Sequence, residues 1–257
     1  QNFGRVLELV SDGKVNQFSF VLETSYRYWK DGEITASYTW SDIKDNTSYN
    51  GNVANSATLS TLVESDPRNL RMTYSDNQFR NKVVLYGNSP TIAGFTLGIR
   101  YSGIGGTRFS VTSGGNINGD FVDTNDLAYI FPQLTQSLID DPEVGKALKN
   151  YITDYNNQIA ERNGGKNAFY GVWDVRVAKK IKFEKIGAFE LSVDIFNLAN
   201  LLNREWGVNK SYGNMSLYRI NKFDPVTKQF EYAKNTSGLA PLSGNPYQIQ
   251  IGAKYSF

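Results

Sequence analysis

The sequence predicts an all-β protein, a transmembrane antiparallel β-barrel, and three observations carry this prediction. Apolar and polar residues alternate with period two in about ten segments, connections between these segments are alternately short and long, and the composition is aromatic yet hydrophilic. Aromatic side chains make up 14% of the 257 residues, while the mean hydropathy is -0.42. A barrel wall explains this combination, because one strand face meets lipid, the other meets water, and Tyr and Phe gather at the interfaces.

The alternation is clearest at the C-terminus, where Tyr247, Ile249, Ile251, Ala253, Tyr255 and Phe257 alternate with polar or small residues. Residues 187–198, 169–182, 94–112 and 32–42 repeat this pattern, whereas it is blurred in 79–88 and 214–223. We predict strands at 3–10, 15–29, 32–42, 79–88, 94–112, 169–182, 187–198, 214–223, 227–234 and 246–257. All of them are expected to belong to one domain, residues 1–257.

The lengths of the connections give a second, independent pattern. The short ones are 30–31, 89–93, 183–186 and 224–226, and the long ones that alternate with them are 43–78, 113–168, 199–213 and 235–245. Bacterial outer-membrane barrels pair short periplasmic turns with long outer loops. The pattern therefore predicts a location in the outer membrane of a Gram-negative bacterium, in contact with its lipid.

The composition argues against several classes of protein. The chain has no Cys and no His, which removes thiol catalysis, cysteine metal sites and the commonest general base. Its net charge of +2 comes from 27 basic and 25 acidic residues spread along the chain, so there is no electrostatic footprint for nucleic acid. We expect neither an enzyme nor a nucleic-acid partner.

Neither of the usual helical membrane signals is present in the sequence. No run of 18 apolar residues could form a spanning helix, and residues 1–10 lack the basic and apolar regions of a signal peptide. Membrane strands need only about 9 to 11 alternating residues. An exported protein with this opening is expected to be mature or truncated.

The longest predicted loop, 113–168, is expected to contain a helix. Asp141, Pro142 and Glu143 have the residue types of an N-cap and an acidic first turn. The apolar residues of one helical face follow, and Gly164 offers a stop; that face consists of Val144, Leu148, Tyr151, Ile152, Tyr155 and Ile159. We predict an extracellular helix that lies on the mouth of the barrel.

A polar loop at 115–126 is a candidate calcium site. Asp120, Asp123, Asn125 and Asp126 place oxygen ligands at short spacing around glycines, which suits a hard cation. The closing Glu of an EF-hand is absent. The alternative is a polar loop rich in Asx turns; no other cofactor is expected.

Four segments resemble the C-terminal third of TonB-dependent outer-membrane receptors of the Oar-like and SusC-like type: NDLAYI at 125–130, IAERN at 159–163, WDVR at 173–176 and VDIFNLANLLNREWG at 193–207. The terminal Tyr255-Ser256-Phe257 is similar to the signal that such barrels present to the barrel assembly machinery. The resemblance covers residues 120–257, while the first hundred residues match only as generic barrel strands.

The resemblance implies a 22-stranded barrel around an N-terminal plug, with about ten C-terminal strands in this chain. It also implies partners: the TonB complex, reached through an N-terminal part that this sequence does not contain, and, as in relatives from Bacteroidota, a surface lipoprotein lid. The expected function is active import of a carbohydrate, a peptide or a siderophore. Two alternatives stay open, a self-contained small barrel and a surface protein that holds a partner through its outer loops without transport.

The charged residues on the polar strand faces are candidate lumen residues. Asp174, Arg176, Glu190 and Asp194 lie on these faces of neighbouring strands and could pair across them. They are expected either to contact plug or substrate or simply to form a polar wall. Glu161 and Arg162, where the long loop returns, are expected to form a salt bridge or a loop anchor.

The aromatic residues fall into two sets. Those near strand ends suit an interfacial girdle: Tyr26, Tyr28, Trp29, Tyr38, Trp40, Tyr101 and Tyr255. Those in predicted outer loops could stack on a ligand or pack the loops: Tyr49, Tyr151, Tyr155, Trp206 and Tyr212.

Overall fold

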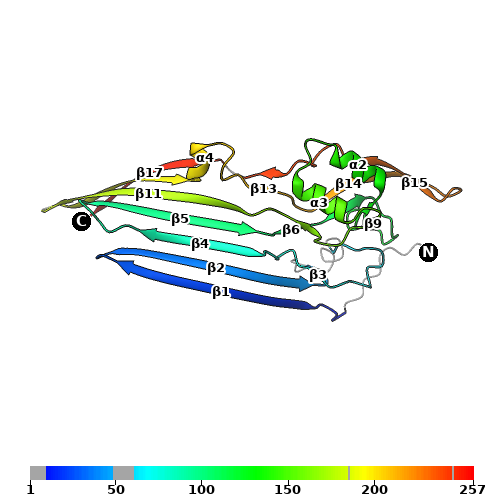
Figure 1. Cartoon of the computed structure of the whole chain (residues 1–257), viewed down its shortest axis with the longest axis horizontal. Coiled ribbons are helices and arrows are strands. Elements are labelled where there is room, and N and C mark those ends of the chain that lie inside the picture. The colour runs from blue at the N-terminus through cyan, green and yellow to red at the C-terminus, as the bar shows by residue number, and fades with distance from the viewer. Residues whose placement is uncertain (1–9, 49–60, 185, 245) are drawn as a thin grey trace.

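The computed structural model describes residues 10–48, 61–184, 186–244 and 246–257. Long antiparallel strands dominate it, in the order β1-β2-β4-β5-β11-β12-β17, with the short β3 paired to the end of β2 (Figure 1). The bounds are β1 Val15–Tyr28, β2 Gly32–Asp45, β3 Thr73–Tyr74, β4 Asn81–Asn88, β5 Phe95–Gly105, β11 Tyr170–Phe183, β12 Gly187–Phe196 and β17 Gln248–Ser256. The predicted all-β antiparallel fold is confirmed. The sheet is open, since β1 and β17 pair with no further strand among the described residues.

The two ends of the main sheet differ. Short connections join β1 to β2, β4 to β5 and β11 to β12, and all three lie at the end marked by the C-terminus in Figure 1. The long connections lie at the opposite end. The alternation of short and long connections is therefore confirmed for these three turns. Predicted strand 3–10 falls outside the described residues, apart from Val10.

Residues 106–169 and 210–244 fold together at the second end, and we call them the cap (Figure 1). Its helices are α2 Pro132–Ile139 and α3 Lys146–Asp154, and its sheets pair β6 Arg108–Phe109 with β10 Gly165–Lys166, β8 Tyr129–Ile130 with β9 Gln158–Ile159, β13 Lys210–Ser211 with β16 Leu242–Ser243, and β14 Met215–Asp224 with both β7 Val111–Gly114 and β15 Gln229–Lys234. A short helix, α4 Leu198–Leu202, follows β12. None of the described helices is long and apolar enough to cross a membrane.

Two predicted wall strands belong to the cap instead. Segments 214–223 and 227–234 do form β14 and β15, but β14 pairs in parallel with β7 and not with β12 or β17. The reason lies in their apolar residues, since Leu217 and Tyr218 are buried in the cap. The predicted short turn after residue 223 is present, since β14 and β15 form a hairpin closed by residues 225–228, but the prediction that these two strands belong to the wall is wrong. One long connection joins β12 to β17, and the β14–β15 hairpin points away from the sheet (Figure 1).

The predicted loop helix also needs a correction. The loop at 113–168 has two helices, α2 and α3, and α3 begins after Gly145. Asp141 does not cap it: Asp141 Oδ1 accepts a hydrogen bond from the Glu143 N–H at 3.0 Å in the turn that precedes α3. Most of the predicted apolar face is buried as expected: Val144, Leu148, Tyr151 and Ile152. Ile159 was assigned wrongly, because it lies in β9 and is exposed.

The main sheet has one apolar and one polar face. Opposite residues of an antiparallel ladder share a face, and Val193 lies opposite Val177 on one side and Ile251 on the other. Leu97 continues this row opposite Val177. We call this side the apolar face; its exposed large side chains are Phe18, Phe20, Leu22, Tyr26, Tyr38, Phe95, Leu97, Trp173, Val177, Ile181, Phe189, Leu191, Val193, Ile249, Ile251 and Tyr255.

Candidate functional site

The polar face brings the four predicted lumen residues together. Asp194 lies opposite Arg176, and the Arg176 Nη1 is 2.9 Å from Asp194 Oδ2, while Nη2 is 3.4 Å from Glu190 Oε1. Asp174 lies on the same face and its Oδ1 accepts a hydrogen bond from the Asn197 N–H at 3.0 Å. Because the Arg176 side chain is 47% exposed, each ion pair is worth at most about 1 kcal/mol. These charges therefore contribute little to the stability of the sheet, and they make this face polar and hydrated.

A hollow of about 470 Å³ lies on the polar face at its cap end. Its wall combines two aromatic rings, three side-chain amides and one carboxylate, from Tyr170, Phe196, Asn197, Asn209, Gln248 and Asp174. Aromatic faces together with a few placed hydrogen-bonding groups are typical of sites for polar organic ligands. The parity that groups Asp174 with Arg176 also places Tyr170 on this face, a signal that sequence reasoning missed.

The cap has a continuous hydrophobic core, in which Tyr151 and Tyr212 are buried. The ring of Phe109 packs against both, with centroids 5.5 and 5.2 Å away. The Tyr212 hydroxyl donates to the Leu239 carbonyl at 3.0 Å and accepts from the Gly145 N–H at 2.7 Å, and the Tyr151 hydroxyl donates to the Glu161 carbonyl. Burial raises the pKa of both phenols. These two tyrosines pack the loops, the second of the two roles expected for them.

The other predicted ligand-contact residues have different surroundings. Trp206, on the loop after α4, is 57% exposed and stays available to a ligand. Tyr155 is partly buried, and its hydroxyl donates to Glu161 Oε2 at 2.7 Å; burial followed by this hydrogen bond raises the Tyr155 pKa. Tyr49 lies outside the described residues.

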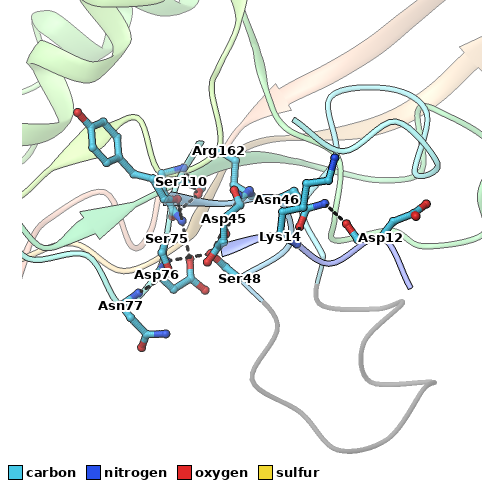
Figure 2. Close-up of polar contacts among 12 residues, drawn as sticks. Asp12, Lys14, Asp45, Asn46, Ser48, Ser75, Asp76, Asn77, Ser110 and Arg162 are labelled. Atoms are coloured by element: carbon cyan, nitrogen blue, oxygen red, sulfur yellow. Dashed lines mark hydrogen bonds and ion pairs between the residues drawn. The ribbon is translucent and has the colours of Figure 1, made fainter. Parts of the chain in front are cut away.

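A buried ion pair fixes the cap to the main sheet (Figure 2). The Arg162 Nη2 is 2.8 Å from Asp45 Oδ1 at the end of β2, and the two side chains are only 5% and 7% exposed. Arg162 also donates to the Asp45 carbonyl and to Ser48 Oγ, each at 2.5 Å. The Ser48 hydroxyl in turn donates to the Asp45 carboxylate at 2.8 Å. The predicted loop anchor is confirmed for Arg162.

The next residue, Asn163, extends this anchor. Its Nδ2 donates to the Tyr74 carbonyl and to Asp76 Oδ1, both at 2.7 Å, and its N–H donates to Ser110 Oγ at 2.8 Å. One side chain therefore joins the cap strand region around Ser110 to the segment that carries β3. Arg162 and Asn163 together hold three separate segments in one place.

The loop at 115–126 is held by Asx turns. Asp120 Oδ1 accepts from the Val122 N–H at 2.8 Å, and its Oδ2 accepts from Asn125 Nδ2 at 2.8 Å. The buried Asp126 accepts from the Ile117 N–H at 2.6 Å, and burial raises its carboxyl pKa. Asp123 is exposed. The geometry agrees with the Asx-turn alternative, and calcium binding stays a prediction.

The C-terminal residues lie on the apolar face at the short-turn end. Tyr255 is opposite Phe189, with ring centroids 5.5 Å apart, and its hydroxyl donates to the Ile186 carbonyl. The ring of Phe257 is 6.0 Å from that of Tyr255. This places two aromatic rings at the end of the last strand, and a role as an assembly signal stays a prediction.

No protein-family model matches the chain, and searches of curated proteins and of solved structures find no match either. The two faces of the main sheet, the hollow and the cap are therefore the features that bear on function.

Proposed function

We propose that the chain forms part of the wall and the outer loops of a transmembrane β-barrel, in a TonB-dependent importer of the Gram-negative outer membrane. The observation that carries this proposal is the apolar face, which runs across all seven long strands and is covered by no described residue. Soluble proteins rarely leave apolar patches larger than a few hundred Å² uncovered. Lipid covers such a surface, and the opposite polar face suits a hydrated lumen.

The dimensions of the apolar face agree with this proposal. On β11 it extends from Trp173 to Phe183, which at about 3.3 Å per residue is about 33 Å along the strand. A strand tilted by about 40° would then cover about 25 Å, the height of the apolar band of outer-membrane barrels.

Lys179 behaves as a lysine in such a band would. Apart from Asp42 and Lys44 at the cap end of β2, it is the one charged residue on the apolar face among the described strand residues. Its Nζ donates to the Ala93 carbonyl in the short turn at 2.5 Å and lies over the Phe95 ring, 4.0 Å from the ring centroid. The side chain thus carries its charge toward the turn, as lysines do when they snorkel to a membrane interface.

The two edges of the main sheet, β1 and β17, pair with no other described strand, and this favours a larger barrel over a self-contained small one. Unpaired N–H and C=O groups are too costly to leave in lipid, so membrane strands occur in closed barrels. In the proposal, further strands pair with β1 and β17. In the receptors that the sequence resembles, the N-terminal part of the same protein supplies these strands and the plug.

The cap and the hollow define the outer side. With the short turns in the periplasm, the cap lies outside the cell, and the hollow beneath α4 opens to the lumen. Rings, amides and a carboxylate favour a ligand with hydroxyl or amide groups, a carbohydrate or a peptide, over a purely apolar one. The second candidate, a barrel that holds a partner protein through its loops, is favoured by one observation: the cap is a folded unit with its own core.

The intact mass of the native protein and its capture by the periplasmic domain of TonB test this proposal together. An importer extracted from outer membranes in detergent is expected to have a mass several times 28.8 kDa and to be captured. A mass near 28.8 kDa would leave no room for a plug and would sink the importer proposal. A large mass without capture would support the partner-holding barrel instead.

A further inference from the structure

Three cations gather around one tyrosine at the cap end of the apolar face. Tyr74 in β3 lies opposite Lys44 in β2, so the two side chains share a face. Lys44 has the same parity as Trp40, which lies opposite Phe20 on the apolar face. The surroundings of Tyr74 therefore continue the apolar face beyond its last apolar row.

The distances show that the cations converge on the ring. The Tyr74 centroid is 3.6 Å from Arg108 Cζ, 5.3 Å from Lys44 Nζ and 5.9 Å from Arg80 Cζ. Arg80 also lies 5.1 Å from the Trp40 centroid. The Trp40 ring is 5.8 Å from that of Phe18, which is exposed on the apolar face. A chain of rings thus leads from the apolar face to the cations, which we call the cation cluster (Lys44, Arg80 and Arg108).

The positive charge of this cluster is only partly balanced. Asp42 pairs with Arg80 at 2.8 Å. Neither Lys44 nor Arg108 forms an ion pair with an acid in the part of the chain that the structure describes, and Arg108 Nε is buried without a hydrogen-bond partner. Burial lowers the pKa of the Arg108 guanidinium and outweighs Tyr74, which acts in the opposite direction; the charge of Arg80 also lowers this pKa, and the more distant charge of Glu161 raises it. A partly buried cation that forms no ion pair is costly, and an anion from outside would lower that cost.

The position of the cluster indicates which anion it receives. Guanidinium groups match the geometry of phosphate oxygens, and basic clusters beside a membrane recognise anionic lipid head groups. Aromatic rings at the same level are typical of the membrane interface. On the proposed function, on which this step rests, the cluster lies at the outer rim of the lipid band. We propose that Lys44, Arg80 and Arg108 bind the phosphate of a phosphorylated glycolipid in the outer leaflet.

The test measures binding of bisphosphorylated lipid A to the native protein in detergent micelles by native mass spectrometry. The double variant Lys44→Gln/Arg108→Gln is expected to bind the lipid at least about tenfold more weakly, because it removes two charge-assisted contacts to phosphate. Lys82→Gln is the matched control, because Lys82 is a lysine at the same end of the sheet, next to Asn81 at the start of β4, but lies on the polar face. Arg108→Lys retains the charge and is expected to retain most of the binding.

Three results would overturn the inference: equal binding by wild type and the double variant, an equal loss in Lys82→Gln, or equal binding of lipid A from which both phosphates have been removed. A competition with inorganic phosphate distinguishes a site for free anions from a site for the lipid. If phosphate displaces the lipid at a similar concentration, the site is not a lipid site. Insertion into phosphatidylcholine vesicles distinguishes a failure of the lipid-site inference from a failure of the proposed function. A protein that inserts but shows no phosphate preference refutes only the lipid site, whereas one that does not insert refutes the proposed function.

Discussion

Replacing Arg162 by Ala is expected to cost about 3 to 5 kcal/mol and to detach the cap from the end of β2, because the substitution leaves the Asp45 carboxylate buried without its cation. The pair is almost fully buried, so water cannot compensate the charge without opening the contact. Ser48 loses its guanidinium partner at the same time. The main sheet itself makes few of these contacts and should remain folded.

Hydrogen exchange of the backbone amides measures this effect. Protection should fall in residues 158–167 and 73–76 of Arg162→Ala and stay unchanged in β11 and β12. The double variant Asp45→Leu/Arg162→Met removes both charges and should recover much of the protection, since replacing a buried pair by apolar residues is often neutral or stabilising. Loss of protection in the double variant as large as in the single one would show that the charge is not what holds the cap.

Ile251→Arg is expected to destabilise the membrane-inserted protein by about 2 to 4 kcal/mol, the cost of Arg at the middle of the lipid face of a barrel. Ile251 lies in the central row of the apolar face, opposite Val193, and is 79% exposed. The described residues of β12 and β17 on that face include no acid that could pair with the new charge. The cost comes from the lipid and not from lost packing.

The neighbouring residue provides the matched control. Gln250 is on the polar face, opposite Asp194, so Gln250→Arg gains an acidic neighbour and should change the stability by less than about 0.5 kcal/mol. Urea titrations in phosphatidylcholine vesicles give both values. Equal effects of the two substitutions would mean that the two faces of β17 meet the same medium.

The strands of the main sheet could be predicted because period two is a local property. Residues 187–196 and, with the exception of Lys179, residues 173–183 carry it, and both segments lie in strands that begin and end within a residue or two of the predicted bounds. The same period led to the wrong place for β14 and β15. A strand buried in the cap alternates like a wall strand. Nothing in the sequence of 215–224 indicates that this strand pairs with β7. Local pattern fixes the element, whereas long-range pairing fixes the sheet.

The candidate site was predictable only in part, for similar reasons. Parity alone grouped Asp174, Arg176 and Asp194 correctly. Tyrosine, in contrast, suits both a hydrated binding surface and a core in which its hydroxyl finds a partner. The role of Tyr212 becomes clear only from the partners of its hydroxyl, the Leu239 carbonyl and the Gly145 N–H. The partner of Arg162 is 117 residues away in the chain, beyond the reach of any local motif.

A nitroxide scan of β11 tests whether the apolar face is exposed to lipid. The chain has no Cys, so single cysteines can be placed from 173 to 181 without a background label. In vesicles, collisions with oxygen, which concentrates in lipid, are expected to peak at Trp173, Val175, Val177 and Ile181. Collisions with a water-soluble nickel complex should peak at Asp174, Ala178 and Lys180. Oxygen and nickel profiles that rise and fall together, or high nickel access at Val177, would contradict a membrane-spanning wall.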